Sequence, residues 1–304
     1  MTTCPDAPFR SGFVTLIGRP NAGKSTLLNA LMGKKLAITS DTDQTTRHRF
    51  RAILNNENSQ IVLVDTPGIH TPHDVLGEEL NASAIEALDD IDVVALLIDA
   101  SKPVGRGDEW VAQTIKGKRY KKILVLSKSD LVDPFTLDEQ RKAACELADF
   151  DEVVCLSAKK NRGLGDFIDA VSSMLPEGPR WFPEDMDTDQ PMEVMVAEFI
   201  REKILYRTRD EIPHSIGVIC DTLEYDKKKD LYRIFATIYV EREGQTGIII
   251  GAKGAGIKAI GSQAREDLEV LLGGRVYLDL QVKVRKNWRR DLNQIRRFGY
   301  GEGV

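Results

Sequence analysis

The sequence has few cysteines and no long apolar run, and each shortage excludes a class of protein. The cysteines are scattered and form no Cys-x-x-Cys pair: Cys4, Cys145, Cys155 and Cys220. This pattern predicts no disulfide framework and no structural metal, and it favours a reduced, cytoplasmic compartment. No apolar stretch approaches the ~20 residues of a membrane span. The opening residues also lack the basic and apolar regions of a secretory signal.

Charge is unevenly distributed along the chain. The 304 residues carry a net charge of -5, yet residues 244–297 hold 11 basic and five acidic side chains. A basic C-terminal region on an acidic chain favours a polyanionic partner. A merely solvated surface would give the same balance, so charge alone does not decide between the two.

One glycine-bearing stretch fits a phosphate-binding loop. Residues 18–25 read Gly18, Arg19, Pro20, Asn21, Ala22, Gly23, Lys24 and Ser25. An apolar run precedes them and a helical pattern follows, which is the context that the Gly-x-x-x-x-Gly-Lys-Ser pattern requires. Backbone N–H groups and the helix N-terminus then face an anion. Lys24 is expected to reach the β- and γ-phosphates, and the Ser25 hydroxyl to bind Mg²⁺.

The first 176 residues alternate between short apolar runs and helical patterns. Strands are expected near residues 49–54, 61–64, 93–98, 122–126 and 153–156, with helices between them. This alternation predicts an α/β domain over residues 11–176, with a mostly parallel sheet and helices on both faces. The polar, threonine-rich residues 36–51 have no clear period and are expected to form a mobile loop. Ligands of such folds bind at the carboxyl ends of the strands.

Polar motifs stand at several of these strand ends. Asp65, Thr66, Pro67, Gly68 and Ile69 follow one strand, and Asp65 suits a place near Mg²⁺ while Gly68 offers an N–H to the γ-phosphate. Alone, this motif is equally well a plain turn. Thr45 or Thr46 is expected to complete the Mg²⁺ shell. Lys24, Thr45, Thr46 and Gly68 are therefore the candidate catalytic residues.

Two further strand ends suit a purine base. Ser127, Lys128, Ser129 and Asp130 follow one strand, and the Asp130 carboxylate matches the two N–H donors of guanine. The Lys128 stem is expected to pack over the base. Ser157, Ala158 and Lys159 follow the next strand and are expected to place a backbone N–H near guanine O6.

Four prolines separate this domain from a second one. Residues 177–191 are expected to form a linker and residues 192–290 a smaller α+β module of order α-β-β-α-α-β, followed by a basic C-terminal tail over residues 291–304. The module contains a Gly-x-x-Gly loop, Gly251, Ala252, Lys253 and Gly254, between an apolar run and a helix. This context is typical of a KH module, whose loop clamps single-stranded RNA. Lys258, Lys283 and Arg285 add charge; a plain turn between helices is the alternative.

These motifs together resemble the Era family of GTPases. The resemblance covers about residues 11–290 and rests on residues 18–25, on Gln44-Thr45-Thr46-Arg47-His48, on residues 65–68 and on the KH-like module. The family's base motif is Asn-Lys-x-Asp, and Ser127 replaces its asparagine here. Because that asparagine holds the base and braces the phosphate loop, the shorter serine is expected to weaken nucleotide binding.

The resemblance also bears on catalysis. Ile69 stands where other GTPases place a glutamine that orients water, so slow intrinsic hydrolysis is expected. In similar potassium-stimulated GTPases, an asparagine at the position of Asn21 helps to hold K⁺. Equally, Asn21 suits an unusual backbone angle.

The resemblance implies a GTP-hydrolysing switch, with GTP or GDP and Mg²⁺ as ligands. It would bind 16S ribosomal RNA near its 3′ end and assist assembly of the small (30S) ribosomal subunit and rRNA maturation, as a cytoplasmic monomer. Two alternatives stay open. One is a constitutive RNA-binding or chaperone protein with a structural nucleotide site. The other is a cell-cycle GTPase at the periphery of the inner membrane.

Overall fold

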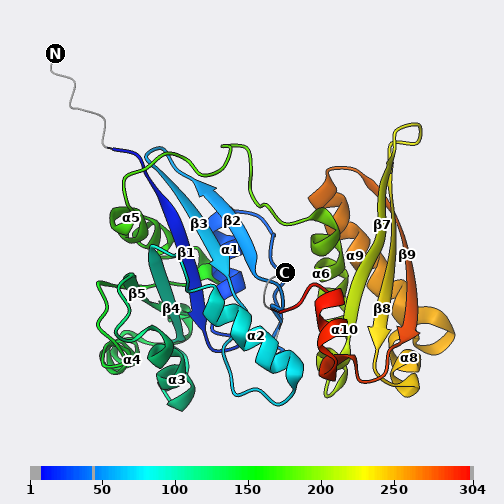
Figure 1. The fold of residues 1–304 in the computed structure, drawn as a ribbon, viewed down its shortest axis with the longest axis horizontal. Helices are drawn as coiled ribbons and strands as arrows, with labels where there is room; N and C mark the ends of the chain where they lie inside the picture. The colour runs from blue at the N-terminus through cyan, green and yellow to red at the C-terminus, as the bar shows by residue number, and fades with distance from the viewer. Residues whose placement is uncertain (1–7, 43–44, 302–304) are drawn as a thin grey trace.

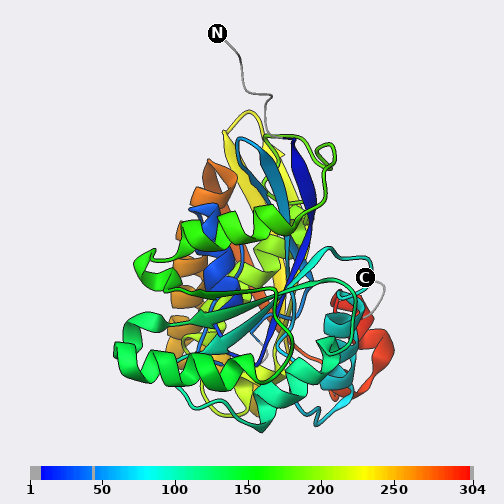
Figure 2. The same cartoon turned by 90° about the vertical axis from the view of Figure 1, so that its left-hand side faces the viewer.

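A computed structural model describes residues 8–42 and 45–301 and places two domains side by side (Figure 1). Viewed after a 90° turn, the first domain stands in front of the second (Figure 2). Gln44, part of the motif that carries the family resemblance, lies outside the described residues. Within the described part of the chain, no helix combines the length and the hydropathy that crossing a membrane demands.

The first domain is built on a six-stranded sheet of order β2-β3-β1-β4-β5-β6. Only β2 runs antiparallel to its neighbour. The strands are β1 (Arg10–Gly18), β2 (Phe50–Asn55), β3 (Ser59–Asp65), β4 (Val93–Asp99), β5 (Lys121–Ser127) and β6 (Glu152–Cys155). The predicted α/β architecture is thereby confirmed, including an edge strand where residues 49–54 suggested one.

Helices cover both faces of this sheet, because neighbouring residues of each buried strand point to opposite sides. Leu16 packs with α1 and α5, whereas the next residue, Ile17, packs with α2, α3 and α4. The helices are α1 (Lys24–Met32), α2 (Val75–Glu86), α3 (Arg106–Ile115), α4 (Pro134–Cys145) and α5 (Leu164–Met174), with 3₁₀ turns η1 (Ser129–Leu131) and η2 (Ala158–Lys160).

The proline-rich linker follows the edge of the first domain's sheet. The N–H of Ile53 in β2 donates to the carbonyl of Asp187 at 2.8 Å. Thr188 Oγ1 donates to the Arg51 carbonyl at 2.6 Å, and Gln60 Nε2 to the Phe182 carbonyl at 2.8 Å. In Figure 1 this segment crosses from α5 to the second domain. The linker is thus bound to β2 and β3 along its length.

The second domain pairs a three-stranded sheet, of order β7-β8-β9, with helices on one face. Its elements are α6 (Met192–Leu205), α7 (Ile212–Ser215), β7 (Gly217–Asp226), β8 (Leu231–Val240), α8 (Glu243–Ile250), η3 (Ala252–Gly254), α9 (Ala255–Leu272) and β9 (Arg275–Val284). Phe199 and Ile200 of α6 and Leu268 of α9 pack on Ile234 and Ile238 of β8. The expected order is found, with the short α7 added, and α8 occupies the stretch that sequence reasoning described only as an apolar run.

The C-terminal segment differs from the expected basic tail. It forms η4 (Trp288–Arg290) and α10 (Leu292–Arg297). Trp288, Phe298 and Tyr300 pack with Leu76 and Leu80 of α2 in one apolar cluster. In Figure 1, α10 lies between α2 and the second sheet. Aromatic burial, which a reading of charge alone misses, therefore fixes this segment between the two domains.

Candidate functional site

The loop between β1 and α1 has the backbone of an anion cradle. Gly23, directly before α1, has φ of 99°, and Asn21 has φ of 61°. A side chain at Gly18 would bring its Cβ to 2.6 Å from the Leu97 carbonyl oxygen, so only glycine fits there. The glycines thus allow the loop to curl back over the N-terminus of α1, where backbone N–H groups and the helix dipole favour an anion.

Lys24 is the buried cation of this cradle. Its side chain is 6 % exposed, and Nζ donates to the carbonyls of Gly18 at 3.2 Å and Arg19 at 3.3 Å. Burial lowers the pKa of the Lys24 ammonium, while the charge of Asp65 opposes that shift. The Arg19 side chain turns away, with Nε 2.8 Å from an Asp108 carboxylate oxygen. Of these two predicted residues, therefore, only Lys24 directs its charge into the loop.

Three oxygen-bearing side chains meet next to Lys24. Ser25 Oγ lies 2.6 Å from Asp65 Oδ2 and 2.9 Å from Thr46 Oγ1. Burial raises the pKa of the Asp65 carboxyl, and its Oδ1 is buried without a hydrogen-bond partner among the described residues. Thr45, in contrast, bonds through its hydroxyl to Ser40 Oγ at 2.6 Å and to the Thr42 carbonyl at 2.5 Å. The structure therefore brings Thr46, but not the Thr45 hydroxyl, to this centre.

This donor set fits Mg²⁺. A carboxylate with a free oxygen and two hydroxyls are hard oxygen donors, which Mg²⁺ prefers over nitrogen or sulfur. A bound cation would also oppose the cost of burying the Asp65 charge.

The segment after β3 presses against the phosphate loop. A Cβ on Gly68 would lie 2.8 Å from both N and Cα of Pro20, so the two backbones nearly touch. Thr66 Oγ1 donates to the Leu16 carbonyl at 2.8 Å. Ile69 is 1 % exposed and packs in the core between the sheet and α3. Its side chain is therefore buried in the protein interior.

Ser127 braces the phosphate loop despite its short side chain. Its Oγ donates to the Ala22 carbonyl at 2.6 Å and also lies 3.1 Å from the Ile98 carbonyl. Lys128 Nζ donates to the Asn21 carbonyl at 2.8 Å and to Asp99 Oδ2 at 2.7 Å. The bracing contact expected of an asparagine is thus made by serine, with help from Lys128.

Asp130 and Ser157 come together from two different strand ends. Ser157 Oγ donates to Asp130 Oδ1 at 2.5 Å, and this hydrogen bond holds the pKa of the Asp130 carboxyl below its usual value. Ser129 N–H donates to the Leu156 carbonyl at 3.1 Å, which ties the two loops to each other. Ala158 and Lys159 follow in η2. The Asp130 carboxylate is therefore fixed as an ionised acceptor.

Residues 36–51 are named here the switch segment, and its described residues lie next to the phosphate loop. A cavity of about 130 Å³ lies between them. Asn21 Nδ2 donates to the Asp41 carbonyl across it at 2.9 Å. The cavity is lined by Pro20, Asn21, Gly23, Lys24, Ser25, Thr26, Ile38, Thr39, Ser40, Asp41, Thr42, Thr45, Thr46, Gly68 and Lys128.

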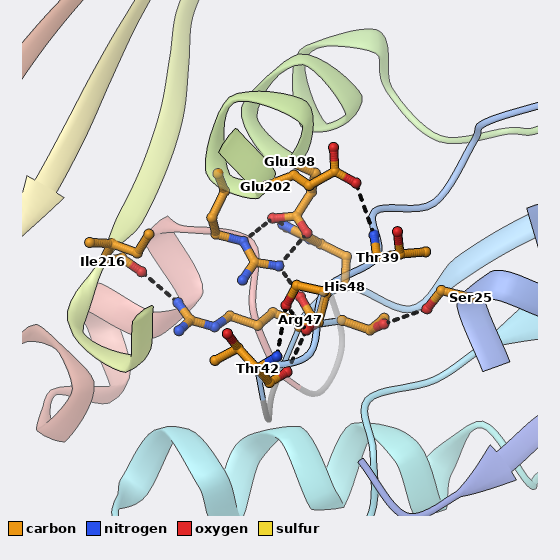
Figure 3. A network of polar contacts seen from close by, with 12 residues as sticks. Ser25, Thr39, Thr42, Arg47, His48, Glu198, Glu202 and Ile216 are labelled. Carbon is orange, nitrogen blue, oxygen red and sulfur yellow. Dashed lines mark hydrogen bonds and ion pairs between the residues drawn. The ribbon is translucent and has the colours of Figure 1, made fainter. Parts of the chain in front are cut away.

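The described parts of the switch segment contact the second domain, which the sequence did not indicate. Ile38 is 4 % exposed and packs in that domain's apolar core. Arg47 is 1 % exposed, and its guanidinium donates to the carbonyls of Ile216 at 2.6 Å, Pro213 at 3.1 Å and His214 at 3.1 Å. Figure 3 shows Arg47 reaching Ile216 while Ser25 lies on the opposite side of the segment.

Residues of α6 complete this contact. Glu198 is 14 % exposed and pairs with the buried Arg201 at 2.6 Å, and Arg201 also donates to the Thr45 carbonyl. The Thr39 N–H donates to Glu202 Oε1 at 3.0 Å, as Figure 3 shows. The helix therefore holds the switch segment at two backbone positions.

Glu202 connects the switch segment to the helix that follows the Gly-x-x-Gly loop. Its side chain is fully buried, and Oε2 accepts from Lys35 and, at 2.9 Å, from Lys203. Both lysines also pair with Asp267 of α9, at 2.6 Å and 2.5 Å. Since α9 begins directly after Gly254, one helix joins the loop to this charge cluster.

Three residues of the Gly-x-x-Gly loop have a positive φ. Gly251, Lys253 and Gly254 have φ of 71°, 50° and 80°. A groove of about 400 Å³ beside it is lined by Ile257, Lys258, Gly261, Ser262, Arg265, Val276, Tyr277, Leu278 and Leu280. Lys258, in α9, therefore lies in the groove beside the loop. Lys283 and Arg285 do not line this groove, because they lie with Tyr239 on the sheet face that points away from α9. The Arg285 guanidinium stacks 4.9 Å from the Tyr239 ring.

Several residues of these sites escaped sequence reasoning. Asp99 ends β4 in the same way that Asp65 ends β3, and this strand-end position was a usable signal. Arg201 and Glu202 gave none, because their partners in the switch segment lie more than 150 residues away in the sequence. Glu198 pairs with Arg201 three residues on, a spacing that is common on any helix.

Comparison with known proteins agrees with this geometry. A family model described as 50S ribosome-binding GTPase matches residues 13–128, and a KH domain model matches residues 211–289. The crystal structure of an Era variant from Aquifex aeolicus bound to GDP.AlF4⁻ is 38 % identical, with a TM-score of 0.93 over 96 % of this chain and 100 % of that chain. Era in complex with MgGDPNP and nucleotides 1506–1542 of 16S ribosomal RNA is 39 % identical, with a TM-score of 0.91 over 96 % and 99 %.

Proposed function

This chain belongs to the Era family of GTPases, and we propose that it is a nucleotide-controlled switch that binds 16S ribosomal RNA and assists assembly of the small ribosomal subunit. GTP hydrolysis is the activity of the first domain. The proposal concerns what that hydrolysis controls. A relative bound to 16S ribosomal RNA supports the choice of RNA, and the Gly-x-x-Gly loop and its groove are the surface that would hold it.

Ser25, Thr46 and Asp65 would hold Mg²⁺, which supplies positive charge to the phosphate oxygens when GTP is bound. Lys24 contributes a second, fixed positive charge, and Gly68 lets the backbone after β3 approach the phosphate loop. Asp130 accepts hydrogen bonds from the base, which selects guanine. Ile69 takes no part in orienting water, because its side chain is buried in the core.

The switch proposal rests on one observation: adjacent residues of the switch segment contact different domains. Thr46 bonds Ser25 at the phosphate site, while the next residue, Arg47, bonds three carbonyls of the second domain. A γ-phosphate that orders Thr46 would therefore act on the domain interface directly, through one peptide unit. The proline-rich linker offers a less direct route, because it is hydrogen-bonded to β2.

A second contact leads on to the RNA-binding loop. The Thr39 backbone bonds Glu202, and the lysines on Glu202 bond Asp267 of α9. Because buried charges lose several kcal/mol when one partner moves away, this cluster favours discrete arrangements over gradual deformation. Movement of the switch segment would thereby shift α9 and the Gly-x-x-Gly loop at its start.

Potassium is part of this proposal. The Asn21 amide bonds the Asp41 carbonyl, so it lies where the phosphate loop and the switch segment meet. A monovalent cation held there would add positive charge near the phosphates, in the place of an arginine finger.

The test is a measurement of RNA affinity with GDP and with a non-hydrolysable GTP analogue, using the full chain and an RNA of the 16S 3′ end. Tighter binding with the analogue supports the proposal, and RNA must then tighten analogue binding by the same factor. Identical RNA affinities with the two nucleotides would reject the switch and favour a protein that binds RNA constitutively. Crosslinking in cells, followed by sequencing of the bound RNA, would identify the natural target.

A further inference from the structure

The hairpin that joins β7 to β8 ends in a strongly basic tip. Residues 226–230 read Asp-Lys-Lys-Lys-Asp, and the three lysines are exposed. Both aspartates have partners: Asp226 pairs with Arg233 at 3.4 Å, and Asp230 accepts from the Tyr225 hydroxyl at 2.6 Å. Within residues 8–42 and 45–301, no ion pair engages Lys227, Lys228 or Lys229. Three ammonium groups thus stand free of intramolecular partners.

This tip is fixed to one end of the RNA groove. Arg275, the first residue of β9, donates to the Lys229 and Asp230 carbonyls. The groove continues from Arg275 along β9, where Val276, Tyr277 and Leu278 line it against α9. The Gly-x-x-Gly loop stands at the other end, before the first residue of α9. Since α9 has 18 residues and is therefore about 27 Å long, the loop and the basic tip occupy opposite ends of one channel.

We propose that Lys227, Lys228 and Lys229 form a second phosphate contact for the same RNA strand, beyond the nucleotides held by the Gly-x-x-Gly loop. This rests on the proposed RNA binding. A Gly-x-x-Gly loop holds about four nucleotides, so a longer strand that leaves the groove at Arg275 meets the tip. Lys258 and Arg265 line the intervening groove, which makes the path basic at its start, middle and end.

Lysines on a hairpin bind phosphate as mobile point charges, so the contact carries affinity but no base preference. RNA is favoured over an anionic bilayer because the tip stands at the end of a groove that begins beside the Gly-x-x-Gly loop and carries Lys258 and Arg265 along its length. The tip therefore extends the length of RNA that is held without changing which bases are read.

The experiment uses the full chain and fluorescence anisotropy with three RNAs: a short core that fills the groove, and the core extended by six nucleotides at its 5′ or at its 3′ end. The test variant is Lys227→Gln/Lys228→Gln/Lys229→Gln. The matched control, Lys116→Gln/Lys118→Gln/Arg119→Gln, removes equal charge from an exposed loop of the first domain.

Only one of the two extensions is expected to tighten binding of the wild type, because the groove has one outlet at the tip. The tip variant should lose about tenfold on that RNA at 0.1 M salt, with a shallower salt dependence, and nothing on the core. The control should match the wild type on all three RNAs. The proposal is overturned if the tip variant binds the extended RNA normally, or if it weakens core and extended RNA alike.

Vesicles containing anionic lipid provide the remaining comparison. Loss of vesicle binding in the tip variant, with RNA binding intact, would assign the tip to a membrane surface and reject the RNA contact. Gly254→Asp separates this test from the proposed function. If that variant binds the core RNA as well as the wild type does, the Gly-x-x-Gly loop is not the clamp, and RNA binding itself is misassigned.

Discussion

Thr46 and Arg47 are neighbours in the chain, yet their side chains belong to different domains. The Thr46 hydroxyl lies 2.9 Å from Ser25 Oγ beside the phosphate loop, and the Arg47 guanidinium lies 2.6 Å from the Ile216 carbonyl in the second domain. Successive side chains of an extended segment point to opposite sides, so a single step along the backbone spans the interface. Any change in the position of Thr46 therefore also displaces Arg47 and its contacts with the second domain.

Replacing Arg47 by lysine should uncouple nucleotide from RNA. One ammonium cannot reproduce the guanidinium's planar set of bonds to three carbonyls, and each buried carbonyl left unpaired costs about 1–3 kcal/mol. The ratio of RNA affinities with GTP analogue and GDP should fall toward one, while GDP affinity is retained. Anisotropy with each nucleotide measures this ratio. Arg51→Lys, in the same segment but salt-bridged to Asp189 of the linker, is the control; an unchanged ratio in Arg47→Lys would contradict the role of Arg47.

Asp130 should determine the choice of base. Its carboxylate is held ionised by Ser157 and would accept two donors of guanine, which adenine lacks. Competition binding should show strong displacement of a labelled GDP by GTP and little by ATP. Asp130→Asn should shift the preference toward xanthine nucleotides, because the amide donates where the carboxylate accepts. Equal displacement by ATP and GTP would reject the guanine assignment.

Ser127 should matter more as a brace than as a base contact. In Ser127→Ala the Ala22 carbonyl loses its 2.6 Å donor inside a buried site, and the expected cost in nucleotide affinity is about 1–3 kcal/mol. Ser127→Thr, which keeps the hydroxyl, is the conservative comparison. Isothermal titration with GDP measures both variants. If alanine binds GDP as tightly as serine does, then Lys128 alone holds the loop.

Potassium should accelerate hydrolysis if Asn21 helps to hold it. Replacing K⁺ by Na⁺ at constant ionic strength should slow phosphate release by the wild type. Asn21→Gly keeps the positive φ of 61° accessible but removes the amide, so its rate should be slow and equal in both salts. Equal wild-type rates in K⁺ and Na⁺ would mean that Asn21 has only a structural role, in which its amide bonds the Asp41 carbonyl.

The Glu198–Arg201 pair should make the interface sensitive to acid. Burial favours the neutral carboxyl, but the charge and hydrogen bonds of Arg201 outweigh burial and lower the pKa of Glu198 below its usual 4.5. A lowered carboxyl pKa contributes stability that is present above pH 4.5 and is lost as the pH falls through the folded-state value. Urea unfolding between pH 6 and 3.5 should show this loss in the wild type. The Glu198→Gln variant should be less stable at pH 6, and its free energy of unfolding should depend less on pH. If the free energies of wild type and variant fall in parallel as the pH is lowered, the Glu198–Arg201 pair is not the cause.

The residues predicted for the nucleotide site lie together because they stand at strand ends. Gly18, Lys24, Asp65 and Asp130 each follow an apolar run, and parallel strands bring their carboxyl ends to one edge of the sheet. Their convergence follows from topology. The structure adds which threonine approaches Ser25, a distinction that two adjacent identical residues conceal in the sequence.

The contacts between the domains were not predictable in this way. Ile38 sits in a polar segment with no periodicity, yet it packs in the core of the second domain. Glu202 occupies an ordinary helical position, and nothing local indicates that it accepts the Thr39 N–H. Trp288, Phe298 and Tyr300 did carry a signal, since three aromatics within 13 residues suit burial better than a solvated tail.

The attachment of the linker to β2 also concerns aggregation. An unpaired edge strand exposes N–H and C=O groups that can add a strand from another molecule. The linker occupies this edge, where the Ile53 N–H donates to Asp187 and the Arg51 carbonyl accepts from Thr188. Proteolytic cleavage within residues 177–191 would release that cover. A nicked chain would therefore present an open sheet edge and self-associate even while both domains remain folded.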